Sequence, residues 1–186
     1  IRSYTKLIPA IQDFPNEIIV TIDDDVRYHK NMLKYLLRRH KKYPNAIIGH
    51  RIRRIRYNAR YKSWKLYKRI SVLKFSFKPS FRNLQTGVGG VLYPPHSLSK
   101  KMLRPEVFMQ LAPTVDDIWF WAAAVANGTK IAPIPFGFWR QPDLKKPASV
   151  TLSSTNVYSS NDVNRKVFES IIKKYPTIKK RFESIN

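Results

Sequence analysis

The chain has 186 residues, which is enough for one well-buried domain and few for two. It contains no cysteine, which excludes disulfides and thiolate metal sites and fits a reducing cytosol. No apolar run approaches the length of a membrane span and the first residues do not resemble a signal peptide, so we expect a soluble, cytoplasmic protein.

The positive charge belongs to one segment of the chain. Lys and Arg number 35 against 12 Asp and Glu, giving a formal net charge of +23. Residues 26–105 hold 22 of these bases and no acid, whereas the rest of the chain has 13 bases and 12 acids. Such a field attracts nucleic acid, anionic lipid headgroups or phosphorylated small substrates, and composition alone does not select among them.

The first predicted elements lead to a cluster of three acids. Apolar spacing predicts a helix within residues 4–14, and the β-branched residues 18–22 predict a central strand of an α/β sheet. Asp23, Asp24 and Asp25 follow at once. Acids this close repel one another unless a cation, a proton or basic groups compensate, so we interpret them as a metal or phosphate-metal site. The alternative is that they end the strand and cap the next helix.

The next helix is predicted by a second apolar pattern. Leu33, Leu36, Leu37 and His40 fall at i, i+3, i+4 and i+7, which predicts a helix that packs through this face. A short strand is expected at residues 46–49.

Bases alternate with isoleucine and then with aromatic residues over residues 51–82, which we expect to form a basic insertion. A solvated edge strand has this alternation. Interleaved bases and aromatic rings are also typical of single-stranded nucleic-acid binders and of interfacial membrane segments. Residues 73–77 predict a further strand in either case.

A glycine-rich turn comes next. Gly87, Gly89 and Gly90 precede a predicted strand at residues 91–93, and they allow a positive φ or a close approach of the backbone to a ligand. A simple bend in the strand is the alternative.

A second pair of acids begins an apolar helix. Asp116 and Asp117 open a stretch that ends at Asn127-Gly128, and Thr114 and Asp117 have the spacing of a capping box. Carboxylates at a helix start are favourable without any catalytic purpose. A strand at residues 130–134 and an amphipathic helix at residues 163–175 complete the predicted elements.

Three motifs follow one another along the chain: IIVTIDDDVRY, then TGVGGVLYPP, then PTVDDIWFW. In combination they resemble family-2-like glycosyltransferases with the GT-A fold, especially those that build bacterial surface polysaccharides. The resemblance implies that Asp23 lies near the nucleoside and Asp24 beside the sugar or ribose. It implies further that Asp25, with Asp23, holds Mn²⁺ or Mg²⁺.

The same resemblance assigns roles to the two later motifs. It places Gly89 and Gly90 beneath the donor sugar and makes Asp117 the base that deprotonates the acceptor hydroxyl, with Asp116 as the alternative. The implied enzyme is a metal-dependent, hexosyltransferase-type glycosyltransferase. It would move a sugar from a nucleotide diphosphate sugar to a glycan or lipid-linked acceptor, with inversion.

The fold expected from the resemblance is the later part of a GT-A domain over residues 1–186. This is a Rossmann-like mixed α/β sheet flanked by helices, and the first N-terminal strands are expected to be missing. The basic segment is expected to meet an anionic membrane, which would make the protein peripheral at the inner face. The rival hypothesis is a basic nucleic-acid-binding protein with an acidic metal cluster, although nucleic acid is the less expected partner.

Overall fold

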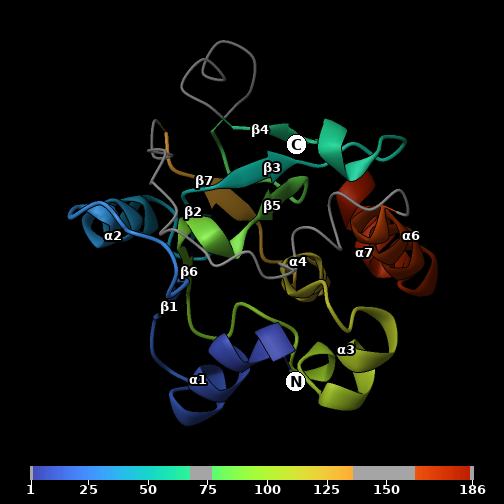
Figure 1. Ribbon diagram of the computed structural model, residues 1–186, viewed down its shortest axis with the longest axis horizontal. Coiled ribbons are helices and arrows are strands. Elements are labelled where there is room, and N and C mark those ends of the chain that lie inside the picture. The colour runs from blue at the N-terminus through green and yellow to red at the C-terminus, as the bar shows by residue number, and fades with distance from the viewer. Residues whose placement is uncertain (1, 68–76, 136–161, 185–186) are drawn as a thin grey trace.

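The computed structural model describes residues 2–67, 77–135 and 162–184, and these form a mixed α/β structure (Figure 1). Within these ranges, no helix has both the length and the apolar character needed to cross a membrane. The elements follow one another in this order: η1 (Arg2–Lys6), α1 (Ile8–Asp13), β1 (Ile19–Thr21), α2 (Met32–Lys42), β2 (Ile47–Gly49), β3 (Ile52–Arg54), η2 (Tyr61–Ser63), β4 (Lys65–Leu66), β5 (Asn83–Gln85), η4 (Gly87–Gly89), β6 (Val91–Tyr93), η5 (Lys100–Met102), α3 (Pro105–Leu111), α4 (Asp116–Asn127), β7 (Ile131–Pro133), α6 (Val163–Lys174) and α7 (Pro176–Glu183).

The larger sheet is mixed and has the strand order β1-β6-β2-β7. Strand β6 pairs antiparallel with both β1 and β2, whereas β2 and β7 are parallel. A mixed sheet flanked by helices confirms the expected α/β class. The prediction that β1 is a central strand is wrong for the described residues, since β1 lies at the sheet edge and pairs with β6 alone. Its β-branched composition fits a half-buried strand as well as a central one.

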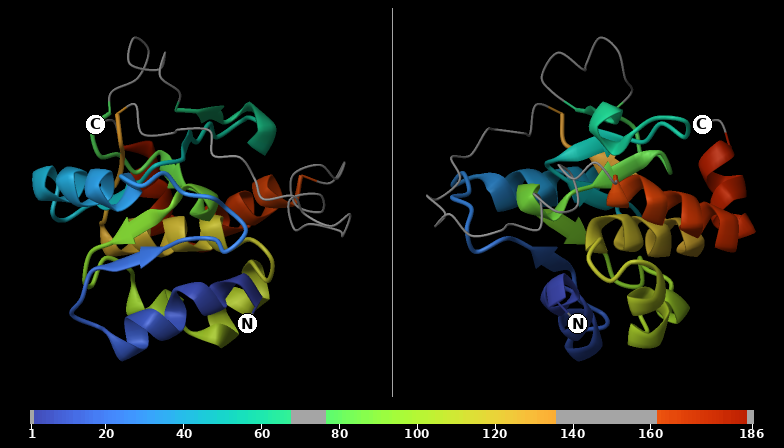
Figure 2. Two further views of the ribbon diagram at one scale, coloured as in Figure 1. Left: turned by 60° about the vertical axis from the view of Figure 1, so that its left-hand side comes forward. Right: turned by 45° about the vertical axis from the view of Figure 1, so that its right-hand side comes forward.

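Helices cover both faces of this sheet. Alternate residues of β2 and β6 point to opposite sides: Ile48 and Leu92 belong to a small core under α2, while Ile47 and Val91 belong to the main core with α4. This alternation follows from the two-residue period of a strand. Helix α4 is apolar on all sides because α6 and α7 cover the side that the sheet leaves free (Figures 1 and 2).

Both tryptophans of the PTVDDIWFW motif lie in the main core. Trp119 and Trp121 are fully buried, and their indole N–H groups donate to Met102 O and Phe81 O, each at 2.8 Å. A buried indole requires such an acceptor. The tryptophans therefore hold α4 in place and present no ring to a sugar.

The predicted packing face of α2 is only partly right. Leu36 is fully buried, but Leu33 and Leu37 are 49% and 38% exposed. The face on the sheet is instead made by Leu36 with the partly buried Met32, Tyr35 and Tyr43. The spacing predicted the helix correctly. The apolar stripe is wider than the area of α2 that contacts the sheet, so two of its leucines remain exposed.

Part of the basic segment forms a second, antiparallel sheet of order β4-β3-β5. Its aromatic residues Tyr61, Trp64 and Tyr67 are buried, and the Arg53 guanidinium lies 4.8 Å from the ring centre of Tyr61. These rings therefore offer no open stacking platform to bases. Most of the strand predicted at residues 73–77 lies outside the described residues.

Candidate functional site

Acids from two distant parts of the chain meet around one lysine. Lys6, at the end of η1, lies 3.1 Å from Asp23 Oδ1 and 3.6 Å from Asp116 Oδ2. Asp23 follows the carboxyl end of β1, and Asp116 is the first residue of α4. The structure thus brings the two sequence-predicted acidic motifs together, and it adds a base that the sequence analysis did not single out.

Helix α4 begins one residue later than a capping box requires. Val115 is the N-cap residue and makes no side-chain cap, so the predicted capping box of Thr114 and Asp117 is wrong. Asp117 lies in the first turn, and its Oδ1 accepts a hydrogen bond from the Gly87 backbone N–H at 2.9 Å. The Asp117 side chain therefore reaches from the first turn of α4 to the glycine-rich turn.

The glycine-rich turn fits this site only because positions 87 and 89 carry no side chain. A Cβ on Gly87 would lie 2.6 Å from Lys6 Nζ, and one on Gly89 would lie 2.5 Å from Arg51 Cβ. Gly90 has a φ of +82°, a conformation that L side chains rarely adopt. The prediction of a positive φ is confirmed at Gly90, whereas the approach of this backbone to a ligand stays a prediction. The groups that the turn approaches are Lys6 and Arg51, and contact of Gly89 and Gly90 with a donor sugar stays a prediction.

The local field favours one protonated carboxyl. Burial and the neighbouring Asp116 carboxylate raise the pKa of Asp117 to about 7, although Lys6 and the Gly87 N–H act to lower it. Burial acts to lower the pKa of Lys6, but the carboxylates of Asp117, Asp116 and Asp23 together raise it above its ordinary value. Lys6 therefore stays charged at neutral pH, while Asp117 is poised to take up or release a proton.

Tyr28 ties the loop after β1 to the glycine-rich turn. Its hydroxyl accepts a hydrogen bond from the Asp23 backbone N–H at 2.9 Å and donates to Val88 O at 3.1 Å. The same hydroxyl therefore fixes the acidic loop and the turn relative to each other. Sequence reasoning missed Tyr28, because nothing local distinguishes it from the other tyrosines of residues 26–105.

Arg51 adds a second positive charge beside the turn. Its Nη1 donates to Thr86 Oγ1 at 2.9 Å, and the Thr86 backbone N–H donates to Arg51 O at 3.0 Å. The guanidinium is thus held on the side chain of Thr86, the residue before Gly87. Its position between β2 and β3, where the charged run begins, was the available signal.

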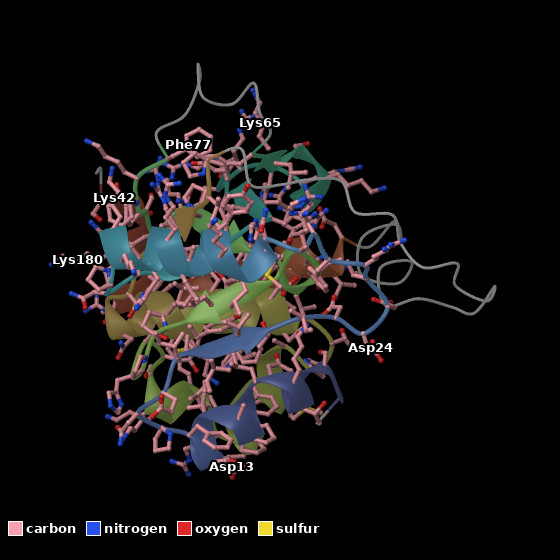
Figure 3. The ribbon with its side chains drawn as sticks, turned by 90° about the vertical axis from the view of Figure 1, so that its left-hand side faces the viewer. Asp13, Asp24, Lys42, Lys65, Phe77 and Lys180 are labelled. Atoms are coloured by element: carbon pink, nitrogen blue, oxygen red, sulfur yellow. The ribbon has the colours of Figure 1, made fainter. Side chains whose placement is uncertain are left out.

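The remaining two acids of the first motif lie further out. Asp24 is exposed and Asp25 is half-buried, on the loop that leaves β1 (Figure 3). No group of three or more His, Asp or Glu side chains within the described ranges is arranged to hold a metal. Mg²⁺ and Mn²⁺ commonly use only one or two carboxylates plus water and substrate phosphates, and Asp25 can supply one. Asp23 is already paired with Lys6.

A separate hollow lies at the other end of β1. It measures about 240 Å³ and is lined mainly by apolar and proline residues, among them Ile11, Phe14, Ile19, Tyr93 and Pro95. Ile19 begins β1 whereas Asp23 follows its last residue, so this hollow is not part of the acidic site.

Comparison with known proteins adds no relative from which a role could be carried over. No protein-family model matches the chain, and no curated protein and no solved structure matches it. The geometry described above is therefore the basis for assigning a function.

Proposed function

We propose that this chain is a glycosyltransferase that moves a sugar from a nucleotide diphosphate sugar to an acceptor hydroxyl. The observation that supports it best is the meeting of Asp23 with Asp116 and Asp117 around Lys6, above the glycine-rich turn. A site with carboxylates for a metal and a base, and with fixed positive charges, suits the transfer of a group away from a diphosphate. GT-A is the architecture we assign to the sheet.

In this proposal the donor lies at the carboxyl end of β1. Asp23 and Asp24 contact the nucleoside and sugar, and Asp25 holds Mn²⁺ or Mg²⁺. When bound, the metal neutralises charge on the leaving diphosphate. Asp23 serves as a second metal ligand only if Lys6 releases it, because the ammonium now lies 3.1 Å from its Oδ1.

Asp117 is the proposed base. A pKa of about 7 lets the carboxylate accept a proton near neutral pH, which a carboxylate of ordinary pKa does poorly. The acceptor oxygen attacks the anomeric carbon as its proton passes to Asp117, and the bond from that carbon to the diphosphate oxygen breaks. The electron pair leaves with the nucleoside diphosphate, and in-line attack inverts the configuration.

Lys6 and Arg51 supply fixed positive charge for the leaving group. Both lie against the glycine-rich turn, Lys6 in contact with the acids and Arg51 on the Thr86 hydroxyl. Charge that is already positioned does not need to reorganise during the reaction. The acceptor in this proposal is a glycan or lipid-linked sugar of the kind used in surface polysaccharide synthesis.

The binding test is isothermal titration with UDP and then GDP, with and without Mn²⁺. We expect one nucleotide to bind in a metal-dependent way, and Asp25→Ala to abolish this binding. Asp13→Ala, which removes an exposed carboxylate on α1, is the matched control and should bind as the unaltered protein does. Failure of both nucleotides to bind would reject the proposed donor site.

The reaction test is turnover with the sugar nucleotide identified by titration. Asp117→Asn keeps an acceptor oxygen for the Gly87 N–H but cannot take a proton, so we expect at least about a hundredfold loss of kcat. Below about pH 7, kcat/KM of the unaltered enzyme should fall about tenfold per pH unit. Full activity of Asp117→Asn would exclude Asp117 as the base and transfer the role to Asp116.

A further inference from the structure

The outer side of α2 combines exposed leucines with exposed bases. Leu33 and Leu37 lie one helical turn apart and are 49% and 38% exposed. Lys34, Arg38 and Lys41 are exposed and follow the same turns of the helix. We call these five residues the α2 stripe. Figure 3 looks onto α2 and β1 from this side.

Within the described residues, the bases of the α2 stripe, Lys34, Arg38 and Lys41, form no ion pair with an acid. The sequence has no Asp or Glu anywhere between residues 26 and 105. Arg39, by contrast, turns inward, where it donates to Phe77 O and lies over the Tyr43 ring. Among the described residues, the stripe therefore presents positive charge without a paired acid, together with apolar side chains.

Exposed apolar side chains also lie beside β1. Val20 of β1 packs against the small core under α2. Ile18 and Ile22 lie just before and just after this strand, and they are 39% and 51% exposed. Apolar side chains are thus open both on α2 and at the two ends of β1.

We propose that the α2 stripe is a docking surface for an anionic phospholipid membrane. An interfacial helix inserts leucines at the boundary between headgroups and acyl chains, while lysine and arginine reach the phosphates beside it. Charge complementarity selects this occupant. A second copy that packs through the same stripe would bring Lys34, Arg38 and Lys41 against like charges. A nucleic acid backbone would pair with these bases but would make no apolar contact with the exposed leucines. The proposal does not depend on the glycosyltransferase assignment.

The first test is co-sedimentation of the full chain with vesicles of phosphatidylcholine alone or with about 30% phosphatidylglycerol. We expect binding to the anionic vesicles only. The variant K34Q/R38Q/K41Q should bind about 100-fold more weakly, at roughly one kcal/mol per base. The matched control K101Q/K173Q/K179Q removes three exposed lysines from η5, α6 and α7, and its affinity for the anionic vesicles should fall much less. Equal losses in both variants would show attraction by net charge only and would overturn the proposal.

The second test asks whether the leucines enter the bilayer. Because the chain has no cysteine, Leu37→Cys gives a single position for an environment-sensitive fluorophore, with Lys173→Cys on α6 as control. Anionic vesicles should shift the emission of the label at residue 37 to the blue and leave the control label unchanged. L33S/L37S should weaken binding about tenfold, most visibly at high salt, where the apolar contribution remains.

Three results would contradict the docking proposal. A label at residue 37 that stays in water shows that the leucines do not insert. A dimer in solution that L33S/L37S separates shows that a second copy covers the stripe. Binding to single-stranded RNA that K34Q/R38Q/K41Q abolishes and L33S/L37S leaves intact, without vesicle binding, assigns the stripe to nucleic acid. Unchanged circular dichroism establishes that each variant is folded.

Discussion

The backbone N–H of Gly87 donates to Oδ1 of Asp117 at 2.9 Å, across a separation of 30 residues in the chain. This bond holds the start of α4 against the glycine-rich turn. Lys6, from a third segment, lies beside this hydrogen bond: a Cβ built on Gly87 would be only 2.6 Å from its Nζ. The site therefore depends on three parts of the chain that no local pattern connects.

Removal of Lys6 should make Asp117 harder to ionise. Lys6 acts to lower the pKa of Asp117, and the Asp116 carboxylate acts to raise it. In Lys6→Met, burial and the Asp116 charge still raise the pKa of Asp117, whereas the lowering by Lys6 is lost and only that by the Gly87 N–H remains. The pKa of Asp117 should therefore rise above about 7. Carbon NMR of the aspartate carboxyls against pH measures this, with Asp117→Asn used for assignment. Lys101→Met is the control, and an unchanged titration in Lys6→Met would remove Lys6 from this role.

Asp117 should make the folded protein less stable as the pH rises. Its folded-state pKa of about 7 lies above the ordinary value of 3.8, so the folded state binds more protons than the unfolded state between these values. The free energy of unfolding then falls as the pH increases from about 4 to about 7, by about 2 to 4 kcal/mol. Asp117→Asn should abolish this decrease while keeping an oxygen for the Gly87 N–H. Urea unfolding across this pH range is the measurement, and parallel curves for the two proteins would contradict the prediction.

Two glycine substitutions should separate stability from the site. A Cβ on Gly89 would lie 2.8 Å from the Arg51 backbone N as well as 2.5 Å from its Cβ, so backbone must move. Gly89→Ala should lower the free energy of unfolding by about 1 to 3 kcal/mol. Gly87→Ala meets the flexible end of Lys6 and should cost less, but it should displace Lys6 and raise the pKa of Asp117. Urea unfolding and carboxyl NMR on both variants test the pair, and a larger stability loss in Gly87→Ala would be the opposite of our expectation.

Asn83 should be among the most sensitive polar residues of the fold. Its Oδ1 accepts from Tyr67 Oη and Arg54 Nη1, each at 3.0 Å, and its Nδ2 donates to Ile131 O at 2.8 Å. The side chain is fully buried and links the small sheet to β7. Asn83→Ala leaves these partners unsatisfied and should cost about 3 kcal/mol.

The control for Asn83 is Asn31→Ala. Asn31 precedes α2 and its side chain makes no capping hydrogen bond, so its loss should cost about 0.5 kcal/mol or less. Denaturant midpoints of the two variants give the comparison. Equal small losses would mean that water replaces the Asn83 amide without penalty.

The residues of the candidate site were predicted better than their contacts. An apolar strand that leads to Asp23 and an apolar helix that begins at Asp116 are local patterns, and the structure places Asp23 just after β1 and Asp116 at the start of α4. Lys6 was not predicted as a member, because one lysine among 35 Lys and Arg residues carries no sequence signal. Its role appears only when η1 folds next to β1 and α4.

The sequence alone determined the α/β class, the order of most elements and the glycine at the end of α4, because period, capping and φ preference are local properties. Gly128 indeed ends α4 in the left-handed conformation. Only the tertiary structure decided that β1 is an edge strand among the described residues, that Leu33 and Leu37 face outward, and that Tyr61, Trp64 and Tyr67 are buried. These outcomes depend on which surfaces of distant segments meet, and apolar composition is the same whether a side chain finds a partner or remains at the surface.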